Sequence, residues 1–282
     1  MTEAQRVFPF FVGSPRSGTT LLRAMFDSHS ELAIPGESHF IPRMARERSR
    51  YERPAGFAAD AFVDDLRGDE RFLNWRLPPG SAEAAVESSR PSSLAEALRA
   101  VYAAYAAERG KPRYGDKTPG YVRELPLLAD LFPEARFVHL VRDGRDVVLS
   151  LRERPWGQRG GLETLAAFWR TNVERAFAAR RRLGRRYCEI RYEELIDDPE
   201  PVLNDACAFL ELDYEPEMLS YHERAGALAE SLGTPEGHRH LALPPTSGLR
   251  DWRAEMSVEE LTRFELVAGD ALEQAGYRRA VQ

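Results

Sequence analysis

The chain has 282 residues, of which 43% are hydrophobic and 30% are charged, and its formal net charge is −6 at pH 7. This composition supports a sizeable hydrophobic core, and the negative net charge argues against a general nucleic-acid-binding protein. The sequence shows no signal peptide, no apolar run long enough to span a membrane, and only two cysteines, Cys188 and Cys207, so we expect a cytoplasmic protein with two buried free thiols.

A strand, a short loop and a helix are predicted at the start of the chain. The apolar run Val7–Val12 is typical of a buried strand, residues 13–18 are rich in Gly, Ser and Pro, and helical periodicity begins at Leu21. This order directs backbone N–H groups and a helix N-terminus to one point, which suits a phosphate group. A Gly/Ser turn without function is the alternative.

The loop departs from the usual P-loop pattern, which ends in Gly-Lys-Ser/Thr. Here Gly18 is followed by Thr19, so the lysine that contacts a γ-phosphate is absent, and Arg16 lies earlier in the loop. We therefore expect a nucleotide that carries a 5′-phosphate but is not a triphosphate.

The next segments predict a second strand and a helical insertion. Residues 31–35 are typical of a short strand, which places Glu37 at the carboxyl edge of the sheet, where ligands bind in open α/β folds. Residues 40–109 are mostly helical in pattern and show no strand, so we expect an insertion over about residues 40–110 that covers one side of the sheet. A capping box at residues 93–96 opens one of its helices.

Two further strands are predicted at residues 136–141 and 187–192. Asp143 can cap a helix through Leu151, so the first of these strands repeats the order of strand, turn and helix. Other helices are predicted at residues 119–131, 162–183, 199–210 and, after a cap at Ser257, to about Ala275, with a loop at residues 223–249. The sequence predicts an α/β fold with a central, mostly parallel sheet flanked by helices.

Two segments together resemble the sulfotransferases that use 3′-phosphoadenosine 5′-phosphosulfate (PAPS). Residues 14–20 (SPRSGTT) resemble the 5′-phosphosulfate loop of that family, and residues 141–150 (VRDGRDVVLS) resemble its 3′-phosphate segment. In the family an Arg and a Ser eight positions apart hold the 3′-phosphate, and Arg142 and Ser150 have this spacing. Residues 15–44, and residues 143–145 followed by Arg154, are similar to tyrosylprotein sulfotransferases. The resemblance to the family also covers the segments around Lys117, residues 191–195 and Trp252.

The resemblance implies a fold, a cofactor and a reaction. The fold would be a single sulfotransferase domain over residues 1–282, with three layers, a P-loop-like sheet and the helical insertion. PAPS would be the co-substrate, adenosine 3′,5′-bisphosphate (PAP) the product, and no metal would be needed. The reaction would be in-line transfer of a sulfuryl group to an acceptor hydroxyl, without a covalent enzyme intermediate.

The same resemblance assigns the cofactor contacts. The 5′-phosphosulfate would be held by Arg16, Ser17, Gly18, Thr19 and Thr20. The 3′-phosphate would be bound by Arg142 and Ser150, with Arg154 as a further cofactor contact and Tyr192 near the adenine. The alternatives are an ion pair for Arg16, pairing of Arg142 with Asp143 or Asp146, a solvated helix face for Arg145 or Arg154, and a core or rim position for Tyr192.

Glu37 is the predicted general base, because the acceptor hydroxyl must lose its proton as its oxygen attacks sulfur. The family uses His or Glu at the matching place. His39 is a rival base two residues on, and a strand-end cap or salt bridge is the alternative for Glu37. Lys117, with Arg16, is expected to stabilise the leaving phosphate oxygen, unless it pairs with Asp116 or Asp143.

Two further clusters carry weaker predictions. The Arg-Lys-Gly segment that closes over the 3′-phosphate in cytosolic members is absent before Trp252, and the substitutes we consider are Ser247, Arg250 and residues 238–240. The arginines at residues 180–186 are expected to be the cationic end of a helix, with an anionic-polymer site as the minor alternative.

The function predicted from the sequence is therefore a PAPS-dependent sulfotransferase. A P-loop small-molecule kinase and a non-catalytic nucleotide-binding module are the alternatives. A small-molecule, lipid or glycan hydroxyl is the expected acceptor, selected by the insertion, and a homo-oligomer is an open possibility.

Overall fold

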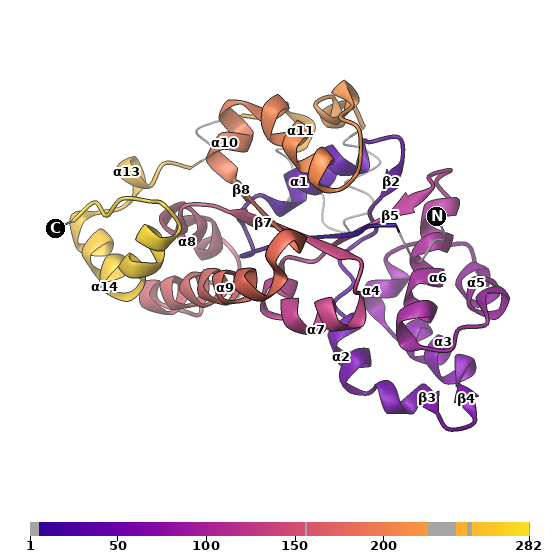
Figure 1. Ribbon diagram of the computed structural model, residues 1–282. Helices are drawn as coiled ribbons and strands as arrows, with labels where there is room; N and C mark the ends of the chain where they lie inside the picture. The colour runs from indigo at the N-terminus through magenta and orange to yellow at the C-terminus, as the bar shows by residue number, and fades with distance from the viewer. Residues whose placement is uncertain (1–5, 156, 225–240, 247–249, 282) are drawn as a thin grey trace.

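The structure is a computed structural model that describes residues 6–155, 157–224, 241–246 and 250–281. At its centre lies a four-stranded parallel sheet in the order β6-β1-β7-β8 (Figure 1). Its strands are β1 (Phe8–Gly13), β6 (Asp116–Lys117), β7 (Ala135–Val141) and β8 (Tyr187–Arg191). The strands run in one direction, so the loops that follow all four open at one edge of the sheet. The predicted α/β fold is confirmed.

The first apolar run of the sequence forms the buried interior strand β1. All six of its residues are buried, as expected for a parallel strand covered on both faces by helices. It pairs with β7 from Phe8 opposite Ala135 to Gly13 opposite Leu140. Both strands therefore end together, and each is followed by a loop and a helix.

Helices cover both faces of this sheet (Figure 1). On one face lie α1 (Thr19–Asp27), α10 (Tyr192–Asp197) and α11 (Pro199–Phe209), and on the other lie α7 (Leu125–Leu131) and α9 (Leu162–Leu183). Beyond the carboxyl edge, α8 (Gly144–Arg152) packs with α13 (Trp252–Glu255) and α14 (Val258–Gln274). The predicted caps are present: Asp143 accepts from the Arg145 N–H at 2.9 Å, and Ser257 forms a full capping box with Glu260.

One predicted helix is divided. In place of a helix over residues 119–131, the chain forms the 3₁₀ helix η3 (Pro119–Arg123) and then α7. Pro126 lies in the first turn of α7. A proline has no N–H to donate and its ring clashes with the preceding turn, so a continuous helix cannot pass through this position.

The insertion is helical, but it also contains a hairpin that the sequence analysis did not predict. Its helices are α2 (Ile41–Arg46), η2 (Arg48–Arg50), α3 (Ala59–Arg67), α4 (Glu70–Leu73), α5 (Ser81–Ser89) and α6 (Leu94–Ala107). The strands β3 (Glu52–Arg53) and β4 (Gly56–Phe57) pair antiparallel, and Gly56, the first residue of β4, has φ 119°. The expectation of no strand in this region was therefore wrong, because a pair of two-residue strands has no detectable period.

The predicted strand over residues 31–35 is shorter and belongs elsewhere. It forms β2 (Leu32–Ala33), which pairs with β5 (Arg113–Tyr114) in a separate two-stranded parallel sheet. The remaining described elements are short 3₁₀ helices, η4 (Gly184–Arg186), η5 (Pro216–Met218) and η6 (Tyr221–Arg224). No helix in the described part of the chain combines the length and apolarity that crossing a bilayer requires.

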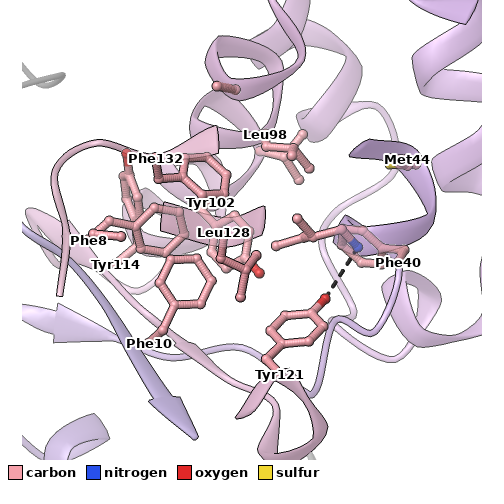
Figure 2. Packing of buried hydrophobic residues seen from close by; sticks show 14 of the residues in the cluster. Phe8, Phe10, Phe40, Met44, Leu98, Tyr102, Tyr114, Tyr121, Leu128 and Phe132 are labelled. Atoms are coloured by element: carbon pink, nitrogen blue, oxygen red, sulfur yellow. Dashed lines mark hydrogen bonds between the residues drawn. The ribbon is translucent and has the colours of Figure 1, made fainter. Parts of the chain in front are cut away.

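An aromatic cluster fixes the insertion on the sheet. The ring of Phe8 in β1 lies 5.0 Å from Tyr102 of α6 and 4.9 Å from Tyr114 of β5, centroid to centroid (Figure 2). Tyr121 of η3 belongs to the same cluster, and its hydroxyl accepts the Ile41 N–H at the start of α2, at 3.2 Å. The helices that follow Glu37 are thus held on the face of β1.

The two cysteines are free thiols. Cys207 is buried as expected, whereas Cys188 in β8 is only partly buried, because its strand lies at the edge of the sheet.

Candidate active site

The loop between β1 and α1 is held in a strained, compact conformation. Arg16 and Gly18 both have positive φ, 75° and 97°. A Cβ at Gly18 would lie 2.5 Å from the ring of Tyr192, so this position requires glycine. From below, Asn172 of α9 donates to Ser14 Oγ at 3.1 Å. Gly18 makes no side-chain cap to α1, so the first N–H groups of the helix remain available for an anion.

A cavity opens at this helix N-terminus. Its polar lining comes from Arg16, Gly18, Thr19, Thr20, Arg142, Ser150 and Thr246, and its apolar lining from Leu21, Tyr192, Ile196, Tyr221, Leu241 and Pro244. The loop after β1 and the segment after β7 therefore meet in one cavity, as the resemblance implied. Of the nine predicted cofactor contacts, Ser17 and Arg154 do not line it.

A residue predicted to bind the 5′-phosphosulfate contacts one predicted to bind the 3′-phosphate. Arg16 Nε donates to Ser150 Oγ at 3.0 Å, and the Arg142 guanidinium lies over the ring of Tyr192, 4.2 Å from its centroid. Arg142 also lies 3.8 Å from Asp146, which is one of the alternatives considered above. Burial raises the pKa of that carboxyl to about 6. Arg142 therefore lines the cavity and also forms a long ion pair with Asp146.

Positive charge accumulates around Arg16. Burial, together with the charges of Arg154 and Arg142, lowers the pKa of Arg16 to about 10. The charge of Arg250 lowers the pKa of Arg16 by a smaller amount. Arg250 itself pairs with Glu255 at 3.2 Å and with Glu153. Ser17 Oγ and Arg142 Nε are buried without a hydrogen-bond partner among the described residues. Buried donors and excess positive charge are what a bound phosphate would satisfy.

The predicted base and cation are in direct contact. Lys117 Nζ donates to Glu37 Oε1 at 2.6 Å and lies 3.5 Å from Thr20 Oγ1, while His39 Nε2 lies 2.9 Å from Glu37 Oε2. The Lys117 side chain is 1% exposed and that of Glu37 is 29% exposed. The pairings considered for Lys117, with Asp116 or Asp143, are not found among the described salt bridges. Lys117 pairs with Glu37 instead, which is the salt bridge considered above as the alternative for Glu37.

These contacts keep Glu37 ionised. Burial favours the neutral acid, but Lys117 and His39 outweigh it and hold the pKa of Glu37 well below its ordinary value. Burial lowers the pKa of the Lys117 ammonium, and the Glu37 carboxylate opposes that shift. The pair thus presents a carboxylate and an ammonium at the carboxyl edge of the sheet, next to the first turn of α1.

Two residues around the second motif have structural roles that the sequence analysis did not predict. Arg145 is neither a cofactor contact nor on a solvated face: it is 2% exposed and pairs with Asp143 at 2.7 Å and Glu265 at 3.2 Å. Its guanidinium lies 3.6 Å from the ring centroid of Trp252. Trp252 is buried in the core of α8, α9 and α14. Glu265 and Trp252 are distant from Arg145 in sequence, so only tertiary packing shows these two partners.

A buried polar network also escaped the sequence analysis. Ser38 and Tyr102 both donate to Asp116 Oδ2, at 2.7 and 2.6 Å, and the Tyr121 hydroxyl lies 2.7 Å from Ser38 Oγ. The available signal was the position of Ser38 and Asp116 beside Glu37 and Lys117.

The weaker predictions have mixed outcomes. The arginines at residues 180–186 do lie at the C-terminal end of α9, where Arg182 pairs with Asp130 and Arg186 donates to the Ala129 and Pro133 carbonyls. Residues 238–240 and Ser247 lie outside the described residues.

Comparison with known proteins places the chain in a family. A sequence model described as "Sulfotransferase family" matches residues 9–216. Protein-tyrosine sulfotransferase 1 of Danio rerio is 25% identical over 277 residues, covering 95% of this chain and 71% of that protein. Protein-tyrosine sulfotransferase 2 of Gallus gallus is 27% identical over 231 residues, covering 77% of this chain and 54% of that protein.

Solved structures agree. The sulfotransferase domain of the Synechococcus PCC 7002 olefin synthase has a TM-score of 0.66 and 25% identity, and covers 96% of this chain and 95% of that domain. The sulfotransferase domain from the curacin biosynthetic pathway has a TM-score of 0.64 and 23% identity, and covers 97% of this chain and 98% of that domain. Because the family model matches well over half of the sequence, the chain belongs to the sulfotransferase family.

Proposed function

We propose that Glu37 is the general base of this PAPS-dependent sulfotransferase and that Lys117 stabilises the leaving phosphate. The observation that carries the proposal is the 2.6 Å hydrogen bond from Lys117 Nζ to Glu37 Oε1. The same Lys117 Nζ lies 3.5 Å from the Thr20 hydroxyl, at the N-terminal end of α1 where the phosphate would bind. A base and a cation therefore flank the place where the 5′ group of the donor would bind. PAPS supplies a sulfuryl group that is already activated by a phosphate leaving group.

The residues that line the cavity support binding of the donor. Arg16, Ser17, Thr19, Thr20 and the N-terminal N–H groups of α1 would hold the 5′-phosphosulfate, and Arg142 and Ser150 the 3′-phosphate. Arg142 lines the cavity, and its Nε has no hydrogen-bond partner among the described residues, which supports this assignment. The apolar lining around Tyr192 suits the adenine. Because Arg16 bonds to Ser150, the two phosphate sites adjoin and Arg16 can reach either. Arg154 would contribute its charge to this cluster.

The residues then divide the chemistry. Glu37 takes the proton of the acceptor hydroxyl as that oxygen attacks sulfur, and Lys117 stabilises the charge that develops on the phosphate oxygen as the S–O bond breaks. His39 holds the second carboxylate oxygen of Glu37 and so orients it. The acceptor proton thus goes to Glu37 and the developing negative charge is stabilised by Lys117, so no covalent enzyme intermediate is needed.

The acceptor is a hydroxyl compound, and we propose a small-molecule, lipid or glycan hydroxyl. The relatives include enzymes named for protein tyrosine and a domain of an olefin synthase, so a tyrosine peptide is the rival outcome of an acceptor screen. The insertion at about residues 40–110 follows Glu37 directly and would form the acceptor wall. The cytoplasmic location and the single domain stay predictions.

Calorimetric titration with PAP, 5′-AMP and ATP with magnesium tests the nucleotide site. We expect PAP to bind far more tightly than 5′-AMP, and Arg142→Ala to weaken PAP about tenfold or more, which is about 1.4 kcal/mol. A preference for ATP with magnesium would instead support a kinase.

Glu37→Gln tests the base. We expect turnover with an acceptor found in a panel of phenols, sugars, lipid alcohols and tyrosine peptides to fall by roughly 10²–10⁴-fold, without weaker PAP binding. His39→Gln is the matched variant and should lose much less. If His39→Gln loses more turnover than Glu37→Gln, the base is His39.

A further inference from the structure

A buried hydrogen-bond network lies directly behind the base and the cation. Asp116 Oδ2 accepts from Ser38 Oγ at 2.7 Å and from the Tyr102 hydroxyl at 2.6 Å, and the Tyr121 hydroxyl bonds to Ser38 Oγ at 2.7 Å. Ser38, Asp116 and Tyr102 are fully buried, and Tyr121 is 2% exposed. None of these side chains faces the cavity of the nucleotide. The reaction described above does not use them.

The network joins the two segments that carry the reacting groups. Ser38 follows Glu37 in the chain, and Asp116 precedes Lys117. A second bond, from the Ser38 N–H to Thr118 Oγ1 at 3.0 Å, links the same two segments on the other side of Lys117. The base segment leaves the small β2–β5 sheet, whereas Asp116 lies in β6 of the main sheet, opposite Phe10 of β1. These bonds therefore set the position of Glu37 relative to the sheet that holds Lys117.

The two tyrosines anchor the network in the core. Tyr102 comes from α6 and Tyr121 from η3, and both rings pack in the aromatic cluster of Phe8 and Phe10 (Figure 2). Buried side chains in such a cluster occupy single rotamers, so the hydroxyls have fixed positions. By contrast, the Glu37 side chain is 29% exposed and depends on its neighbours for its orientation.

Asp116 also balances the charge on Lys117. Lys117 is buried and faces the Glu37 carboxylate, the like charge of Arg23 in α1, and Asp116 in its own strand. Burial raises the pKa of Asp116, and the hydrogen bonds from Tyr102 and Ser38 oppose that shift and favour its carboxylate form. A buried ammonium with one acidic neighbour removed would lose its proton more easily. The hydrogen bonds found for Asp116 come from Ser38 and Tyr102. Asp116 therefore does not compete with the donor for Lys117 Nζ.

We propose that Ser38 and Asp116 are positioning residues: the buried Ser38–Asp116 hydrogen bond holds the Glu37 carboxylate and the Lys117 ammonium at the separation that sulfuryl transfer requires. This inference rests on the proposed roles of Glu37 and Lys117. A purely structural network would also be buried and satisfied, so the test must separate geometry at the pair from stability of the fold.

Ser38→Ala removes the link between the two segments. Tyr102→Phe is the matched control, because it removes the other hydrogen bond to the same oxygen of Asp116 and leaves the Ser38 bond in place. We expect kcat of Ser38→Ala to fall about 10- to 100-fold, while its KM for PAPS changes less than about threefold. Tyr102→Phe should keep most of its kcat, although urea unfolding should show that both variants lose stability.

A second readout does not depend on turnover. Lys111 and Lys117 are the only two lysines of the chain, so NMR of protein labelled with ¹³C-lysine gives two titration curves, with Lys111 as the internal reference. Asp116→Asn should move the Lys117 curve to lower pH by about one pH unit or more. Ser38→Ala should shift it in the same direction as the pair with Glu37 loosens, and Tyr102→Phe should leave it in place.

The outcomes distinguish this inference from the proposed function. Equal kcat for Ser38→Ala and Tyr102→Phe, or a Lys117 curve that Ser38→Ala and Asp116→Asn leave unchanged, would overturn the positioning role. A wild-type protein that binds PAP but sulfates no acceptor would instead contradict the proposed reaction, and the lysine titration would still decide the question of geometry.

Discussion

At the scale of single residues, Lys117 contacts the proposed base and is also the cation proposed for the leaving phosphate. Lys117 Nζ donates to Glu37 Oε1 at 2.6 Å, and His39 Nε2 lies 2.9 Å from Oε2. Both carboxylate oxygens are therefore engaged. Movement of Lys117 toward the donor would free Oε1 to accept a proton. If Lys117 contacts the leaving phosphate as proposed, the donor would compete with Glu37 for the lysine, and donor binding would release the base.

This competition predicts an unusual binding phenotype. Glu37→Gln should bind PAP more tightly than wild type, by about three- to tenfold, because the ion pair between the buried Lys117 and the partly exposed Glu37 must be broken and is worth about 1 kcal/mol. Isothermal titration calorimetry measures the change. In a Lys117→Ala background the same substitution should have no effect. Equal or weaker binding by Glu37→Gln alone would show that the lysine is not withheld from the donor.

At the scale of elements, the interior strand β7 carries a histidine that makes stability depend on pH. His139 is 1% exposed, its Nδ1 lies 2.6 Å from the Tyr187 hydroxyl, and burial lowers its pKa to about 3. The unfolded chain takes up a proton near the ordinary value of about 6.5, whereas the folded protein does not. As the pH falls below about 6.5, the folded protein therefore loses stability, and the loss continues until the pH approaches the pKa of His139 in the folded protein.

Urea unfolding at pH 7.5 and pH 5.5 tests this linkage. Between these two values the wild type should lose about 1.4 kcal/mol more than His139→Gln, since one proton is bound in the unfolded state alone. The glutamine side chain can still bond to Tyr187. If the two proteins lose stability in parallel, His139 does not carry the dependence.

Elements differ in how far local sequence predicts them. The strands β1 and β7 and the helix α9 carry long apolar patterns, and their bounds were predicted to within a residue. The two-residue strand β6 is polar in sequence, and it exists because β1 offers it an edge. Its position there is what brings Lys117 to the site, so the sequence predicted the lysine through resemblance and not through its strand.

The candidate site shows the same division. Arg16, Arg142 and Ser150 were predicted because two short motifs with fixed spacing meet at one sheet edge, and they line one cavity. The salt bridge between Lys117 and Glu37 and the network behind it join segments about 80 residues apart. No periodicity or spacing encodes such contacts, because they depend on how the insertion packs on the sheet.

At the scale of the whole molecule, the C-terminal helix supports the second motif. The helix α8, which carries Ser150, is packed between α9 and α14 in a hydrophobic core that includes Trp252. Two arginines of α8 reach α14: Arg145 pairs with Glu265 in the interior, and Arg152 pairs with Glu260 at 2.8 Å with both side chains about one-third exposed. Glu265 also accepts the N–H groups of Ala280 and Val281, at 2.6 and 3.1 Å. The end of the chain is thus tied to the predicted 3′-phosphate segment.

Substitution of these two arginines compares a buried ion pair with an exposed one on the same helix. Arg145→Met leaves Asp143 and Glu265 as buried carboxylates without their cation, so it should lower the free energy of unfolding by about 3–5 kcal/mol. Arg152→Met removes an exposed pair and should cost less than about 1 kcal/mol. Urea unfolding gives both values. Saturating PAP should raise the midpoint of each variant, because the phosphate contacts are separate from Glu265 and Glu260. Similar losses for the two variants would mean that the interior pair is not what holds α14 against α8.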